Sequence, residues 1–140
     1  MRLLLAALAV LAAGSQPVAA QQATLEGAAQ AAREAWLAHD VGALVGGASA
    51  IVLQIAGAAP SSPVGRAQAE ELLRRYLMGG GEQSVTVVTV REVEPARGFV
   101  ELERRYVVRG TSDVRRETVF LGFRRVGGGW VLGEVRSGGG

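Results

Sequence analysis

The sequence of 140 residues contains no cysteine and no lysine, and it has one histidine, His39, and two aspartates, Asp40 and Asp113. Without cysteine there is no disulfide framework, no thiolate ligand for zinc or an iron–sulfur cluster, and no thiol nucleophile. The lack of lysine excludes Schiff-base chemistry and the lysine of a P-loop. One histidine cannot form a two-histidine metal site. We therefore expect neither a metal ion nor a cofactor.

Charge also argues against one class of partner. All 15 basic residues are arginines, and with 13 acidic residues they give a net charge of +2. A nucleic-acid interface needs clustered basic charge with aromatic side chains for stacking. Here the arginines are dispersed and mostly interleaved with glutamates, so we expect no nucleic acid. The length suits one domain with one hydrophobic core.

The first twenty residues read as a secretory signal peptide. Met1-Arg2 precedes an unbroken apolar run over residues 3–13, and Val18-Ala19-Ala20 offers the small residues that a signal peptidase reads, which places cleavage before Gln21. Eleven residues of helix rise about 16 Å, about half of a bilayer core. We expect an exported chain, periplasmic or secreted, with no membrane anchor after cleavage. Residues 21–137 then form a single domain, followed by a flexible tail at 138–140.

The mature chain shows helical patterns first and strand patterns afterwards. Apolar residues at helical spacing predict a helix over 23–39, and Asp40 can cap a short helix over 41–45. The β-branched run at 50–56 predicts a strand. Ser62-Pro63 predicts the start of a helix that continues to residue 77.

Four strands follow at hairpin spacing, over residues 84–94, 99–109, 114–126 and 130–136. Glycine-rich turns separate them, and the triplet at 127–129 is a hairpin loop because Trp130 begins a strand and not a helix. The predicted fold class is therefore α+β, with N-terminal helices packed on a curved antiparallel sheet of four to five strands.

Turn lengths predict which strand face is buried. Pairing Arg109 with Val114 and Val126 with Trp130 brings one apolar set together, which the helices should cover. The set comprises Val100, Leu102, Tyr106, Val108, Val119, Leu121, Phe123, Val131 and Val135. The opposite face alternates acidic and basic residues but also carries Phe99, Phe120, Trp130 and Leu132. Four large apolar groups on one face predict a homodimer through it; the alternative is a solvated face with isolated apolar residues.

Three stretches carry a resemblance to a known superfamily. They are AREAWLAHDVGALV at 32–45, GRAQAEELLRRYL at 65–77 and RYVVRGTSDVRRETVFLGFRRVGGGWVLGEVR at 105–136. Together with the element order, they resemble the nuclear transport factor 2-like superfamily, in particular its small exported bacterial members of unknown function. The resemblance implies a cone-shaped cystatin-like arrangement, a sheet wrapped around helices, which often holds a ligand.

The resemblance also implies what an enzyme of this fold would need. Ketosteroid isomerases and polyketide cyclases of the superfamily use an Asp or His base inside the cone, aided by Tyr or Asp. Neither Asp40, at a helix junction, nor Asp113, in a turn, falls on an inward strand position. His39 ends the buried stripe of the first helix and is expected to be structural, with a role as general base as the alternative.

A small inward polar group remains as the candidate site. Arg104 and Tyr106 lie on the apolar face of their strand, and Glu117 is predicted to face Tyr106 and to lie diagonal to Arg104. Arg91 joins them if the 95–98 turn sets the matching register, and Gln54 is a weaker candidate. One interpretation is an internal Arg104–Glu117 ion pair, because a buried arginine needs a partner. The other is that these residues line a cavity mouth and hold a ligand.

Two functions follow from this candidate site. The first is an exported, non-catalytic module that binds a small hydrophobic or acidic ligand or another protein. The alternative is an isomerase-, cyclase- or dehydratase-like enzyme acting on a small hydrophobic substrate, with Glu117 or His39 as the base. A glutamate in an apolar pocket suits that role, because desolvation raises its pKa.

Overall fold

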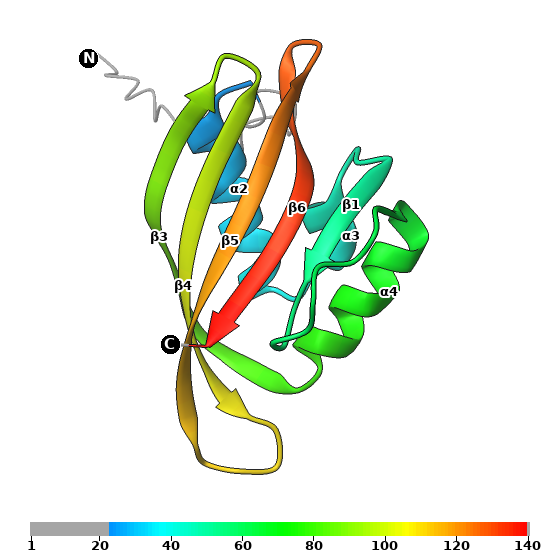
Figure 1. Cartoon of the computed structure of the whole chain (residues 1–140). Helices are drawn as coiled ribbons and strands as arrows, with labels where there is room; N and C mark the ends of the chain where they lie inside the picture. Colours follow the sequence, from blue (N-terminus) through cyan, green and yellow to red (C-terminus); the bar gives the residue numbers. More distant parts are fainter. Residues whose placement is uncertain (1–22, 140) are drawn as a thin grey trace, which may run out of the picture.

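A computed structural model describes residues 23–139 and shows three helices against one six-stranded sheet (Figure 1). The elements in chain order are α2 (Leu25–Leu37), α3 (Val41–Val45), β1 (Ala50–Gln54), β2 (Val64–Gly65), α4 (Arg66–Leu77), β3 (Gly80–Glu94), β4 (Arg97–Val108), β5 (Val114–Val126) and β6 (Gly129–Gly139). The α+β class and the order of elements predicted from the sequence are confirmed. The predicted signal peptide lies outside the described residues.

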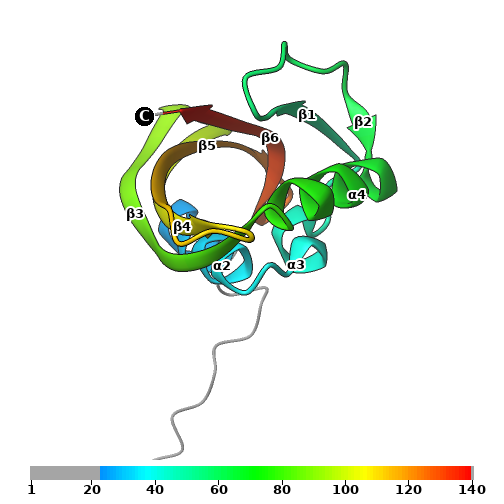
Figure 2. The same cartoon turned by 90° about the horizontal axis from the view of Figure 1, so that it is seen from below.

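The sheet is larger than predicted and is not purely antiparallel. Its strand order is β2-β1-β6-β5-β4-β3, and β1 pairs with β6 in parallel through residues 52–54 and 134–136. The long strands β3 to β6 curl strongly when they are viewed along their axes, with α2 and α3 on one side (Figure 2). The prediction of four to five antiparallel strands is wrong because hairpin spacing relates only strands that are neighbours in the sequence. It gives no information on β1, which pairs with β6 although the two are far apart in the chain.

The helix boundaries follow from their caps. The Thr24 side chain accepts a hydrogen bond from the Gly27 amide at the start of α2, and Asp40 does the same for α3. The third helix begins at Arg66 and not at Pro63, because Val64 and Gly65 first pair with β1. Tertiary pairing thus takes precedence over the Ser-Pro start signal. Each helix buries its apolar stripe, including Trp36 in α2 and Leu73 in α4.

The β4–β5 register differs from the prediction by two residues. Val107 pairs with Val114, so six residues form the connection, and the amide of Val108 still donates to the Asp113 carbonyl at 2.9 Å. A shift of two residues keeps every side chain on its predicted face, because the strand period is two. It does change the neighbours: Arg104 lies directly opposite Glu117, and Tyr106 opposite Arg115.

A β-bulge overturns part of the β5–β6 prediction. Gly122 pairs with Glu134 and Phe123 with Leu132, which leaves Gly133 as the extra residue. The bulge reverses the alternation toward the hairpin, so Trp130 and Leu132 point into the core, where they are 2% and 3% exposed. The predicted outer patch of four apolar residues is therefore wrong, and only Phe99 and Phe120 remain on the outer face.

The strands β3 and β6 both extend beyond their predicted ends. β3 begins at Gly80 and pairs with β4 from its first residue. β6 continues to Gly139, which pairs with Glu117, so residues 138–139 belong to the sheet and not to a flexible tail. Both extensions lengthen the sheet at the end where Arg104 lies. The candidate site therefore lies within a longer part of the sheet than the sequence suggested.

The core should respond strongly to loss of volume at the centre of the sheet. Leu121 is fully buried on β5, whereas Val126 on the same strand is 63% exposed. We expect Leu121→Ala to lower the free energy of unfolding by about 2–5 kcal/mol and Val126→Ala by less than about 0.5 kcal/mol, as measured by urea denaturation. Equal effects of the two substitutions would contradict the assigned faces of β5.

Candidate functional site

Arg104 is a deeply buried charged side chain at the centre of the candidate site. It is 2% exposed and projects from β4 toward the helices. Glu117 lies directly across from it on β5. Glu82, on the neighbouring strand β3, lies on its other side and has a side chain that is 2% exposed. Three adjacent strands thus bring one guanidinium and two carboxylates together in the interior.

All three nitrogens of the Arg104 guanidinium donate hydrogen bonds to these partners. Its Nε donates to Glu82 Oε2 at 3.1 Å, a second nitrogen donates to Glu82 Oε1, and its Nη1 donates to Glu117 Oε1 at 3.2 Å. The fork-to-fork contact with Glu82 is the strong bidentate form of an arginine–carboxylate pair. Every guanidinium nitrogen therefore has an acceptor within the protein.

Aromatic rings enclose the same guanidinium. The ring centroid of Tyr106 lies 3.9 Å from the Arg104 Cζ, and those of Trp36 and Tyr76 lie at 5.6 and 5.5 Å. Trp36 and Tyr76 also meet edge to face, with centroids 6.3 Å apart. The cation is favoured above the electron-rich ring faces, and the rings keep water out. Helices α2 and α4 thus supply the walls of an arginine site whose floor is the sheet.

His39 and Tyr76 extend the hydrogen bonds outward. His39 has a positive φ of 54° directly after α2, and its Nε2 lies 3.1 Å from Glu82 Oε1. Its side chain is 31% exposed, so it lies at the edge of the cluster. The hydroxyl of Tyr76 donates to Glu117 Oε1. We name these five residues, His39, Tyr76, Glu82, Arg104 and Glu117, the buried polar cluster.

The pKa of the Glu117 carboxyl is strongly raised. Burial removes its carboxylate from water and raises the pKa of Glu117 from 4.5 to about 7. Two of the three guanidinium nitrogens of Arg104 are directed at Glu82, so the attraction of the arginine is shared between two carboxylates. A pKa near neutrality would suit a general base. Tyr76 and Arg104 both donate to Oε1 of Glu117, so Oε2 is the oxygen left to accept a proton.

The structure brings together part of the predicted site. Arg104, Tyr106 and Glu117 are adjacent, and the predicted internal Arg104–Glu117 ion pair is present. Arg91 does not join them: it is exposed and pairs with Phe99, so it points to the outer face. Gln54 pairs with Arg136 on the face opposite Leu53, also away from the cluster.

Three members of the site were missed from the sequence. Trp36 and Tyr76 were recognised only as core residues of helical stripes, and nothing in that pattern indicates which charge they would cover. Glu82 was placed before the strand, because β3 was predicted to start at residue 84 and it starts at Gly80. The inward Arg104 was the available signal, since a buried arginine can take a second acid in addition to Glu117.

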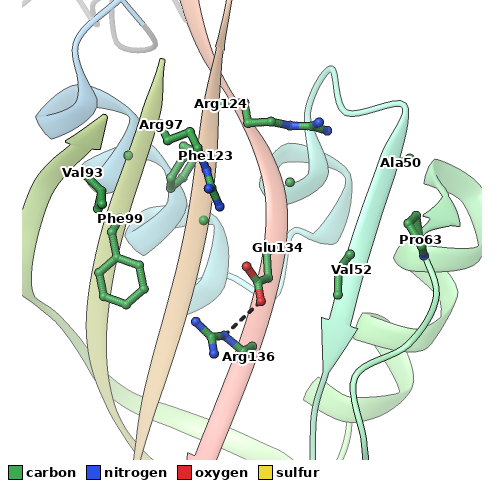
Figure 3. Close-up of a pocket in the computed structure, with 13 residues that line it drawn as sticks. Ala50, Val52, Pro63, Val93, Arg97, Phe99, Phe123, Arg124, Glu134 and Arg136 are labelled. Atoms are coloured by element: carbon green, nitrogen blue, oxygen red, sulfur yellow. Dashed lines mark ion pairs between the residues drawn. The ribbon is translucent and has the colours of Figure 1, made fainter. Parts of the chain in front are cut away.

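A large hollow lies on the opposite face of the sheet, turned away from α2 and α3 (Figure 3). Its volume is about 510 Å³. β5 and β6 form its floor, with Phe99 and Val93 on one side and Val52 and Pro63 on the other. The bulge at Gly133 and the neighbouring Gly122 leave the floor without side chains at its centre. We refer to this feature as the outer hollow.

The outer hollow carries an uneven set of charges. Arg97, Arg124 and Arg136 line it, against a single carboxylate, Glu134. Glu134 is bonded to Arg136 at 3.0 Å. The hollow lies away from the buried polar cluster, and none of the five cluster residues lines it.

Two other hollows lie nearer to the helices. A shallow, open one of about 470 Å³ is lined by His39, Met78 and the loop after β4. A narrow one of about 20 Å³, with room for about one water molecule, lies between α2, α3 and the strands at Phe123 and Trp130. Glu117 lines neither of them. Arg104 does not line them either; it packs against the rings of Trp36, Tyr76 and Tyr106.

Two further properties hold for residues 23–139. No group of three His, Asp or Glu side chains is placed to hold a metal ion. None of these helices combines the length and the apolar character that crossing a bilayer requires.

Comparison with solved structures shows which fold the chain has. No protein-family model matches the sequence, and no curated protein matches it. Among solved structures, a DUF4783 family protein from Bacteroides uniformis superposes with a TM-score of 0.66 at 17% identity, covering 79% of this chain and 95% of its own. A ketosteroid isomerase-like protein from Erwinia carotovora atroseptica gives 0.66 at 19% identity, covering 84% and 94%.

The fold is that of the nuclear transport factor 2-like superfamily. The resemblance stated from the sequence is thereby confirmed at the level of the fold. A further structure of this nuclear transport factor 2-like fold, a hypothetical protein from Catenulispora acidiphila in complex with trimethylamine, superposes with a TM-score of 0.62 at 16% identity, covering 82% of this chain and 86% of that one.

Removing the central cation of the polar cluster should be costly. Arg104→Met keeps an unbranched apolar stem but removes the guanidinium, and it leaves the carboxylate of Glu82 buried without its arginine partner. We expect the free energy of unfolding to fall by about 3–5 kcal/mol in chemical denaturation. Arg105→Met is the matched control, because Arg105 is exposed on the same strand, and it should change stability by less than about 0.5 kcal/mol. Similar losses in both variants would refute a central role for Arg104.

The raised pKa of Glu117 predicts that the free energy of unfolding falls as the pH rises. The raised pKa of Glu117 means that the folded state binds more protons than the unfolded state between pH 4.5 and about 7. Its contribution to stability is therefore present below pH 4.5 and is lost as the pH rises to 7, by at most about 3 kcal/mol. We expect Glu117→Gln to remove this part of the slope.

The measurement is the free energy of unfolding of both proteins at pH 5 and pH 8. The difference between them isolates the contribution of Glu117, because the two proteins share every other group. If the variant and the unsubstituted protein lose the same stability between the two pH values, Glu117 does not titrate in this range.

Proposed function

We propose that this protein is an exported, non-catalytic module that binds a small ligand in the outer hollow. The observation that carries the proposal is the separation of the two sites. The hollow has the volume for a ligand but no residue equipped for acid–base catalysis, whereas the groups suited to catalysis are bonded to one another in the packed interior.

The dimensions and lining of the outer hollow support binding. A volume of about 510 Å³ falls within the range of about 300–1,000 Å³ that is typical of small-molecule sites. The lining combines an aromatic side chain, Phe99, with apolar residues and a few convergent charges. Phe99 is held in place by stacking on Phe120, with centroids 5.6 Å apart. This is the usual composition of a binding site, in which apolar contacts supply area and charged groups supply orientation.

The same lining gives no support for catalysis. Glu134 is the acid of the hollow and is bonded to Arg136, and no histidine, tyrosine or aspartate lines the hollow. Inside the cone, Arg104 donates to Oε1 of Glu117, and His39 contacts Glu82. An isomerase-, cyclase- or dehydratase-like reaction would require this network to open for a substrate. The binding function needs no such rearrangement.

A similar structure and the predicted signal peptide support ligand binding and export, respectively. One structure with this fold contains a small molecule, trimethylamine, which is consistent with ligand binding by such a scaffold. The apolar run at residues 3–13, followed by small residues before Gln21, supports export.

A homodimer through the outer face remains a prediction, but fewer apolar residues support it than the sequence suggested. Of the four apolar residues expected there, Phe99 and Phe120 lie on that face, and Trp130 and Leu132 are in the core. A twofold dimer would place the same patch against itself, so the arginines of the two hollows would approach one another. This repulsion favours a small ligand over a second copy as the occupant.

Native mass spectrometry of the processed protein, purified from its own export compartment, tests the proposed function. We expect the protein, as a monomer or a dimer, to carry a retained small molecule, or its mass to shift after incubation with extracts of small molecules from that compartment. A bare mass in both experiments would contradict the binding function. A stable dimer without any adduct would instead support an interaction module.

A further inference from the structure

Two arginines that line the outer hollow are not paired with an acidic residue in the part of the chain that the structure describes. Arg97 on β4 and Arg124 on β5 form a directly opposed cross-strand pair, and both line the hollow. Like charges opposite each other destabilise a sheet. Glu94 lies across from Arg97 on β3, yet within residues 23–139 neither Arg97 nor Arg124 has a carboxylate within the 4.0 Å of an ion pair.

The side chains of this pair are directed over the hollow and not away from it. Arg97 lies across β5, and Arg124 reaches over β6 toward β1 (Figure 3). Arg136 follows on β6, but its charge is matched by Glu134. Gly122 and Gly133 allow this arrangement: a Cβ on Gly133 would lie 3.3 Å from Arg124 Nε, and one on Gly122 would lie 3.2 Å from Glu134 Cβ. The floor therefore combines free donors with open space.

The walls of the hollow are apolar on both sides of these donors. Phe99 and Val93 stand on one side, and Val93 is 60% exposed although it is a large aliphatic residue. Val52 and Pro63 stand on the other. A ligand that fits must therefore present an acidic group to the arginines and an apolar body to the walls.

The geometry points to a small amphipathic anion as the ligand of the outer hollow, held by Arg97 and Arg124 through its acidic group and by Phe99 and its neighbours through its apolar body. This inference rests on the proposed function and gives that function a chemical class. Guanidinium groups bind carboxylate and phosphate oxygens in the same forked geometry, so the class covers both a free carboxylic acid and a phosphate ester.

The chain contains a matched control for the arginine pair. Arg105 and Arg116 are also directly opposed on β4 and β5, and both are exposed, but they lie outside the hollow. A double substitution there removes the same charge from the same two strands. Any effect confined to Arg97 and Arg124 is therefore due to the hollow and not to net charge.

Two dyes separate the acidic group from the apolar body. The first, 1-anilinonaphthalene-8-sulfonate, carries a sulfonate, and the second, N-phenyl-1-naphthylamine, is the same ring system without it. We expect R97Q/R124Q to weaken binding of the sulfonate dye at least about tenfold and to leave binding of the neutral dye unchanged within about twofold. R105Q/R116Q should leave both affinities unchanged. Salt should weaken binding of the sulfonate dye alone.

Octanoate and octyl phosphate then compete with the bound sulfonate dye, and displacement by either one supports the inference and identifies its acidic group. The inference is overturned if R97Q/R124Q binds the sulfonate dye as tightly as the unsubstituted protein, if R105Q/R116Q loses as much, or if neither competitor displaces the dye. An adduct in native mass spectrometry that R97Q/R124Q retains would leave the proposed function standing and refute this ligand class.

Discussion

The positive charge of Arg104 must be neutralised inside the cone, and this requirement organises the packing of the helices on the sheet. A guanidinium that is 2% exposed would be very unfavourable without compensation, and here it receives two carboxylates and three aromatic rings. Those partners come from α2, α4 and three strands. The cluster therefore ties both longer helices to the sheet at one point.

The outer face is shaped by a second, smaller constraint. One extra residue, Gly133, moves Trp130 and Leu132 into the core and leaves the middle of β5 and β6 without side chains on the other face. The same bulge thus completes the apolar core and opens the outer hollow. Arginines from β4 and β5 border this space, and the single acid nearby is already paired.

Much of the fold could be predicted from the sequence, because it depends on local periodicity and caps. The helix over 41–45 and the strand over 114–126 have their predicted bounds, and the two-residue error in the β4–β5 register left every inward residue inward. The predictions failed where pairing at long range decides the outcome. Neither the parallel contact of β1 with β6 nor the bulge at Gly133 has a local signal, and the latter misplaced Trp130.

The site could be predicted only in part, for the same reason. Arg104, Tyr106 and Glu117 share the inward face of neighbouring strands, which alternation shows directly. Glu82 joins them only because β3 starts earlier than its apolar pattern suggests, and Tyr76 because α4 crosses that end of the sheet. The outer hollow could not be foreseen, since it arises from an absence of side chains that the bulge creates.

We propose that the Arg104 cluster closes the inside of the cone and that the ligand binds on the outer face of the sheet. A crystal structure with bound 1-anilinonaphthalene-8-sulfonate would test both statements at once. We expect the rings against Phe99, the sulfonate at Arg97 and Arg124, and an unchanged contact between Arg104 and Glu82. A dye between the helices and the sheet, with Arg104 turned from Glu82 toward the sulfonate, would contradict both.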